Sequence, residues 1–128
     1  VRMTRMMRVR SLAVVAAVRA LSSSSSAPVS PIKYWALRYT YVDGMLEKRG
    51  PFRQAHLDGL RDMADQGKCA LGGAFNDPCD GAVVLFDSTA CTKDDVEAFA
   101  ATDPYVTNDL VTAWSVSEYM AVVGTLKP

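Results

Sequence analysis

The residues best suited to chemistry in this sequence are a histidine and an aspartate that lie far apart in the chain. His56 is the only histidine, and Asp103 stands directly before Pro104 at the end of a predicted helix. A carboxylate that holds one imidazole nitrogen leaves the other nitrogen free as a base near neutral pH. The pair would support acid/base catalysis on a small organic molecule. The structural alternatives are a satisfied core histidine and an aspartate that only caps a turn.

Two further residues are candidates for substrate binding. Arg53 lies one helical turn before His56, where it can meet an anionic substrate, and Tyr105 follows Pro104, where it can line the same cavity. A solvated surface arginine and a core tyrosine are the corresponding structural alternatives. The sequence has no Gly-rich phosphate loop and no nucleophile elbow, and its three cysteines form no CxxC motif. We therefore expect no metal and no cofactor.

The elements that must position these residues follow from hydrophobic periodicity. Phe52, His56, Leu60 and Met63 recur at helical spacing on one face of a segment that begins at Pro51. The other predicted elements are strands at 32–42, 68–74, 82–86 and 111–123, and a helix that opens at a capping box at 92–95 and ends before 104. The order βαββαβ predicts an α+β, ferredoxin-like fold with a four-stranded antiparallel sheet.

Such a sheet carries its helices on one face and leaves the other face bare. In a domain of this size a bare apolar face is costly in water. We expect a second copy of the chain, or another protein subunit, to cover it, and self-pairing would give a dimeric α/β barrel. Trp35, Leu37, Val84 or Trp114 should contribute, although the two-residue period of a strand does not decide which set faces the partner.

Residues 1–30 have the composition of a targeting segment. They hold five arginines, a run of five serines and no acidic residue, which is typical of an organelle transit peptide. The arginines favour mitochondrial import, to the matrix or a matrix-facing site, over a secretory signal or a chloroplast peptide. The predicted domain organisation is therefore a targeting segment at 1–30 and one globular domain at 31–128.

The charge of the predicted domain limits its partners. Residues 31–128 contain nine basic and fourteen acidic residues, which argues against a nucleic-acid binder because such a protein needs a basic face. No apolar run reaches the roughly 18–20 residues of a spanning helix, so no transmembrane segment is expected.

Several short motifs together resemble the YCII-related (YciI-like) family. They are LEKR at 46–49, Arg53-x-x-His56-Leu57, the AVVLF strand at 82–86 and AFAATDPYV at 98–106. The resemblance spans about Tyr34 to Tyr119. It implies a ferredoxin-like protomer, a dimeric α/β barrel and a cavity with a His–Asp pair, here His56 and Asp103. The segment between Gly73 and Gly81 is shorter than in the family, so the substrate class does not carry over.

Two functional hypotheses follow. In the first, the protein is a small mitochondrial enzyme that moves protons on a carbonyl or carboxylate compound, by isomerisation or elimination. In the second, it is a non-catalytic accessory subunit of a large mitochondrial complex, such as a respiratory-chain complex. There a fold inherited from an enzyme would serve to bind other proteins. The His56–Asp103 pair favours the first hypothesis, and the lack of any substrate signature favours the second.

Overall fold

The computed structural model describes residues 31–126, and the predicted targeting segment at 1–30 lies outside this range. The elements in chain order are β1 (Ile32–Tyr41), α2 (Met45–Lys48), α3 (Gly50–Asp65), β2 (Cys69–Ala74), β3 (Gly81–Asp87), α4 (Lys93–Thr102), α5 (Pro104–Thr107) and β4 (Val111–Ala121). No helix within residues 31–126 is long and apolar enough to cross a lipid bilayer.

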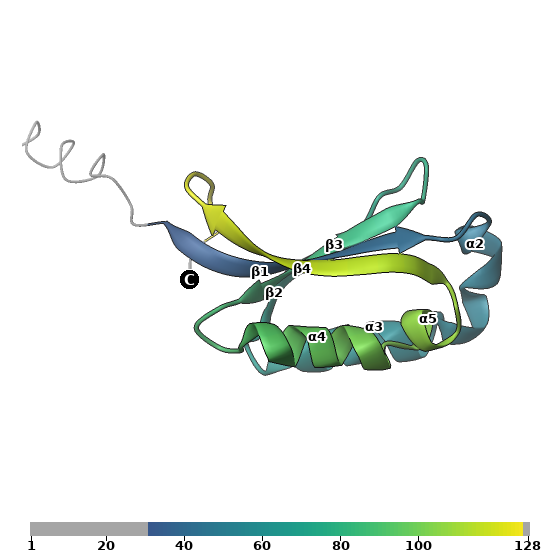
Figure 1. Ribbon diagram of the computed structural model, residues 1–128, viewed down its shortest axis with the longest axis horizontal. Coiled ribbons are helices and arrows are strands. Elements are labelled where there is room, and N and C mark those ends of the chain that lie inside the picture. The colour runs from purple at the N-terminus through teal and green to yellow at the C-terminus, as the bar shows by residue number, and fades with distance from the viewer. Residues whose placement is uncertain (1–30, 127–128) are drawn as a thin grey trace, which may run out of the picture. The chain divides into compact units, whose positions relative to one another are not determined.

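The four strands form one antiparallel sheet in the order β2-β3-β1-β4. The two longer helices, α3 and α4, lie together against one face of this sheet (Figure 1). Each connects two strands that are not neighbours, α3 between β1 and β2 and α4 between β3 and β4. This arrangement is the predicted ferredoxin-like α+β fold.

The strand register corrects the predicted partner-facing residues. Leu37 pairs with Val84 and Val116, and Tyr39 pairs with Trp114, so these side chains share one face of the sheet. That face packs against the helices as part of the hydrophobic core, together with Trp35. The prediction that Trp35, Leu37, Val84 or Trp114 lies on the bare face is therefore wrong.

Residues of the opposite parity form the face that no described helix covers. We call this set the open face, and its central members are Ala36, Arg38, Val83, Leu85, Ser117 and Tyr119. Large apolar residues occur on both faces of β1, because Tyr34 and Trp35 are adjacent. Alternation alone could therefore not distinguish the core face from the open face. Coverage of the open face by a second chain stays a prediction.

The second long helix begins at the predicted capping box. The amide of Asp95 donates to Thr92 Oγ1 at 3.2 Å, and the amide of Thr92 donates to Asp95 Oδ2 at 2.9 Å. Val96 and Ala100 are fully buried below the sheet. Phe99 meets the buried ring of Phe86 edge to face, with 5.6 Å between ring centroids. The cap fixes where α4 begins, and these contacts hold the helix on the sheet with Asp103 directly after its last residue.

Two single-turn helices, α2 and α5, were not predicted. The sequence predicts only that a helix ends before Pro104, but this proline also opens α5, since proline is accepted at the first position of a helix. The turn is closed by the Asp103 carboxylate, which accepts the amide hydrogen of Tyr105 at 2.9 Å. This short helix places Asp103 and Tyr105 side by side at the end of α4.

Candidate active site

The first long helix carries His56 toward the sheet. Pro51 stands in its first turn, and the predicted apolar face of the helix packs on the core. His56 is the only buried residue of α3, with 7% of its surface exposed. A histidine in this position needs a polar partner, because burial without a hydrogen bond is unfavourable.

The structure brings His56 and Asp103 into direct contact. The imidazole Nδ1 lies 2.9 Å from both Oδ1 and Oδ2 of the Asp103 carboxylate, and Asp103 is only 3% exposed. An ionised carboxylate can only accept hydrogen bonds, so Nδ1 carries the hydrogen in this pair. In the neutral imidazole the second ring nitrogen, Nε2, then keeps its lone pair, which is the protonation pattern of a general base.

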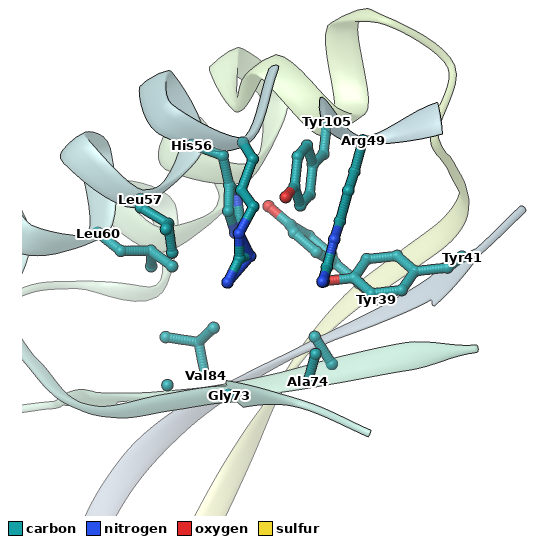
Figure 2. Close-up of a pocket in the computed structure, with 13 residues that line it drawn as sticks. Tyr39, Tyr41, Arg49, His56, Leu57, Leu60, Gly73, Ala74, Val84 and Tyr105 are labelled. Atoms are coloured by element: carbon teal, nitrogen blue, oxygen red, sulfur yellow. The ribbon is translucent and has the colours of Figure 1, made fainter. Parts of the chain in front are cut away.

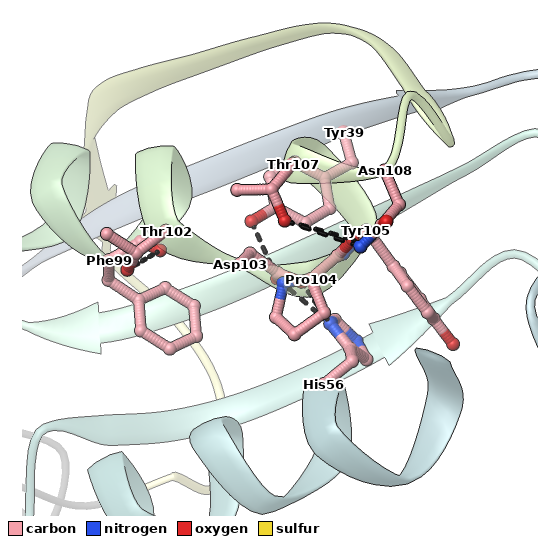
Figure 3. A network of polar contacts seen from close by, with 9 residues as sticks. All are labelled: Tyr39, His56, Phe99, Thr102, Asp103, Pro104, Tyr105, Thr107 and Asn108. Carbon is pink, nitrogen blue, oxygen red and sulfur yellow. Dashed lines mark hydrogen bonds and ion pairs between the residues drawn. The ribbon is translucent and has the colours of Figure 1, made fainter. Parts of the chain in front are cut away.

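The Asp103 carboxylate is held by two further donors. The hydroxyl of Tyr39 donates to Oδ2 at 2.9 Å, and the amide of Tyr105 donates to Oδ1 at the same distance. Figure 3 shows Tyr39, His56 and the α5 turn converging on this one side chain. Three donors from three separate elements therefore fix the carboxylate against rotation.

Two aromatic rings restrain the imidazole. The ring of Tyr105 stacks on His56, with 3.8 Å between centroids and 10° between planes, and Tyr41 meets the edge of Tyr105 at 6.0 Å. Tyr105 is 2% exposed. The imidazole is thus fixed in the plane that lets Nδ1 reach Asp103.

Burial keeps the phenols of this cluster neutral. Burial, reinforced by the neighbouring Asp103 carboxylate, raises the pKa of Tyr39 far above its usual value. Burial also raises the pKa of Tyr41 and of Tyr105, and in both cases nearby arginine charge opposes the rise. At neutral pH these hydroxyls remain hydrogen-bond donors and do not act as bases.

A cavity of about 260 Å³ opens beside His56, between α3 and strands β2 and β3. Its lining includes His56, three tyrosines, two arginines and small or aliphatic residues from both layers. Figure 2 shows Leu57 and Leu60 on one side of His56, and Arg49 with Tyr41 on the other. The cavity is large enough for a small organic molecule in contact with the histidine.

The predicted binding residues Arg53 and Tyr105 both line this cavity. Sequence reasoning missed Arg49, Tyr39 and Tyr41. A signal for Arg49 was present, because it lies four residues before Arg53 and so falls on the same side of the helical stretch. The tyrosines carried no comparable signal, since in a strand they could not be distinguished from core residues.

The remaining reactive side chains form no second centre within residues 31–126. No group of three or more His, Cys, Asp or Glu side chains there could hold a metal ion. Cys69, Cys79 and Cys91 are free thiols, and burial raises the pKa of Cys69 and of Cys91. These two thiols, one partly buried and one buried, remain protonated at neutral pH and are poor nucleophiles.

Comparisons with known proteins agree with the sequence resemblance. A family model of the YCII-related domain matches residues 33–120, and no curated protein matches the chain. Among solved structures, one similar chain is the 5-chloro-2-hydroxyhydroquinone dehydrochlorinase TftG from Burkholderia phenoliruptrix AC1100, in complex with 2,5-dihydroxybenzoquinone. The two chains are 23% identical and superpose with a TM-score of 0.55, over 66% of this chain and 90% of the other. At this identity the likeness concerns the fold.

Proposed function

The chain belongs to the YCII-related family, and from this premise we propose that it is an acid/base enzyme acting on a small carbonyl or carboxylate compound. His56 is its general base, and Asp103 is the residue that orients and supports it. The observation that carries the proposal is the contact of 2.9 Å between Nδ1 and the carboxylate at the wall of a cavity.

The proposed reaction begins with a proton on a carbon next to a carbonyl group. Nε2 of His56 takes this proton, and the electron pair of the C–H bond moves into the carbonyl to form an enolate. The imidazolium that results is stabilised by the Asp103 carboxylate, as in other histidine bases oriented by a carboxylate. Proton transfer by a positioned side chain of this kind increases a reaction rate by a factor of about 10²–10⁴.

Two outcomes complete the reaction without any further reagent. If the imidazolium returns its proton to a different carbon, the substrate is isomerised. If the enolate instead expels a leaving group from the carbon next to the deprotonated one, its electron pair forms a C=C bond and the leaving group departs with the pair of the broken bond. The proton stays on the imidazolium and is then released to water, so the overall reaction is an elimination. The similar solved structure is by its name a dehydrochlorinase, which supports elimination as one option on this fold.

Deuterium exchange tests the proposal without knowledge of the natural substrate. The full chain is incubated in D₂O with small 2-oxo acids and 1,3-diketones, and loss of their C–H signals is followed by proton NMR. We expect exchange above the buffer rate, and a decrease of about 10²–10⁴ in His56→Asn. Asp58→Asn is the matched control, because Asp58 is an exposed carboxylate of α3. Equal exchange in His56→Asn and in the unchanged protein would contradict the proposal.

The mitochondrial location and the accessory-subunit hypothesis are tested by different experiments. An accessory subunit has no need for a hydrogen-bonded base at a cavity, so the geometry of His56 supports the enzyme hypothesis. Native gel electrophoresis of the source extract separates the two: an enzyme migrates alone or as a dimer, whereas an accessory subunit migrates with a far larger complex.

A further inference from the structure

The charged residues that line the cavity beside His56 are both arginines. Arg49 and Arg53 contribute to the lining, and no aspartate or glutamate of residues 31–126 does so. Neither arginine has a carboxylate within 4.0 Å in this part of the chain, whereas Arg61 of the same helix lies 3.5 Å from Asp58. Positive charge is therefore concentrated here, in a domain where acidic residues outnumber basic ones.

The field of the two arginines reaches the catalytic cluster. Arg49 and Arg53 each act to lower the pKa of the Tyr105 phenol, against the larger effect of its burial, and the Tyr105 ring stacks on His56. A negative charge that develops on a substrate next to His56 would be stabilised by the same field.

The other side of the cavity is apolar. Leu57 and Leu60 line it from α3, and Val84 lines it from β3 (Figure 2). Gly72 adds no side chain, and a Cβ there would already stand 3.4 Å from Val84 Cγ1. A ligand that fills the cavity must therefore combine a negatively charged group with an apolar body.

We propose that the cavity binds a small organic carboxylate, with the carboxylate on Arg49 and Arg53 and a compact apolar body against Leu57 and Leu60. The inference rests on the proposed function, because it names the substrate class of the same site. A guanidinium presents paired donors that match the two oxygens of a carboxylate. A carboxylate held on this side of His56 would bring the adjacent carbon within reach of Nε2.

The size of the cavity limits the body of the ligand. Its volume of about 260 Å³ lies below the roughly 300–1,000 Å³ of pockets that hold drug-sized molecules. A single six-membered ring with one carboxylate fits this limit, so benzoate is a suitable probe. Benzyl alcohol is its neutral counterpart, and benzylamine is its cationic counterpart.

The test is a titration of the full chain with each of the three probes, followed by NMR. The single histidine gives one assignable pair of ring signals, which reports binding at this cavity. We expect benzoate to shift the His56 signals and to bind about tenfold or more tightly than benzyl alcohol, and benzylamine not to bind. Arg49→Gln and Arg53→Gln should each weaken benzoate about tenfold or more, since hydrogen bonds to charged groups contribute on this order.

Arg61→Gln is the matched control, because Arg61 lies on the same helix and does not line the cavity; its benzoate affinity should not change. Backbone amide spectra verify that each variant is folded. Three outcomes would each overturn the inference. They are equal affinity for benzoate and benzyl alcohol, a loss of affinity in Arg61→Gln as large as in the other two variants, and His56 signals that benzoate does not shift. Since binding is the readout, the result is independent of deuterium exchange. His56→Asn should lose exchange and keep benzoate binding, which backbone amide shifts report in this variant because it has no histidine.

Discussion

Asp103 is the residue on which the site depends most, because three donors converge on its carboxylate. His56, Tyr39 and the amide of Tyr105 all approach within 2.9 Å. The residue is buried, so removal of an acceptor leaves donors without a partner in a region that water does not reach. Such losses cost more than the hydrogen bond itself.

Asp103→Asn should therefore lower the free energy of unfolding by about 1–3 kcal/mol. The amide group of asparagine places a donor where the carboxylate had an acceptor, so it opposes one of the three donors. Urea denaturation followed by fluorescence measures the change. Asp58→Asn on the exposed side of α3 should change stability by less than about 0.5 kcal/mol, and equal losses in the two variants would contradict this role of Asp103.

Tyr39→Phe removes one of the three hydrogen-bond donors to the Asp103 carboxylate. The ring of Tyr39 is buried, and only its hydroxyl is removed, so its packing is retained. We expect a loss of about 1 kcal/mol in unfolding free energy and slower deuterium exchange, because the carboxylate that orients His56 is less constrained. Tyr119→Phe, at a half-exposed position of β4, serves as the control. An unchanged exchange rate in Tyr39→Phe would limit Tyr39 to a packing role.

The α4 helix fixes the position of Asp103, and its capping box gives it a testable pH dependence. Hydrogen bonds from the backbone and side chain of Thr92 lower the pKa of Asp95 below its ordinary value. The folded protein therefore favours ionised Asp95. This contribution to stability is present above the ordinary carboxyl pKa of about 4 and is lost as the pH falls through the lowered value.

Asp95→Asn should accordingly destabilise the protein at pH 6 and have a much smaller effect near pH 2. Urea denaturation at the two pH values provides the comparison. Asp94→Asn is the control, since Asp94 is also in the first turn of α4 but lies outside the capping box. A stability difference between Asp95→Asn and the unchanged protein that is equally large at both pH values would argue against the ionised cap.

The order of the four strands and the two long helices was predictable from the sequence, whereas the face of the sheet that packs against these helices was not. The spacing of Phe52, His56 and Leu60 and the capping box at Thr92 are local signals, and the structure confirms the elements they predict. The two faces of β1 both carry large apolar residues, so only the strand register assigned them.

The candidate site was predictable only where a motif marked it. His56 and Asp103 are brought together by the packing of α3 against α5, which no local spacing encodes, and their pairing was implied by the family resemblance. Arg49 could have been found from its spacing to Arg53, whereas Tyr39 and Tyr41 required the structure. Their place in the cavity depends on how the helix lies over the sheet, and this is a property of tertiary packing.

For the protein as a whole, the open face predicts self-association. Leu85 lies on that face between Ala36 and Leu71, and a charge there would be buried in any interface that covers it. Leu85→Lys should convert a dimer to a monomer in sedimentation analysis of the full chain. Leu46→Lys, at an exposed position of α2, should leave the dimer unchanged. A stable monomer of the unchanged protein, with no partner recovered from native extracts, would contradict the prediction.

The targeting prediction concerns residues 1–30 alone. Fused to a fluorescent protein, this segment should direct the fusion to mitochondria, because it contains five arginines and no acidic residue. Replacement of Arg2, Arg5, Arg8 and Arg10 by glutamate should abolish import. Fluorescence microscopy of both fusions is the measurement, and delivery to the secretory pathway or unchanged import of the glutamate variant would contradict it.

The proton on the ring of His56 decides whether this site can act as a base. As the only histidine, it gives a single pair of ¹⁵N signals, which can be followed as the pH is raised until they no longer change. The contact with Asp103 predicts that Nδ1 carries the hydrogen and that Nε2 has the chemical shift of an unprotonated nitrogen. A spectrum in which Nε2 carries the hydrogen would leave no base toward the substrate and would contradict the proposed function.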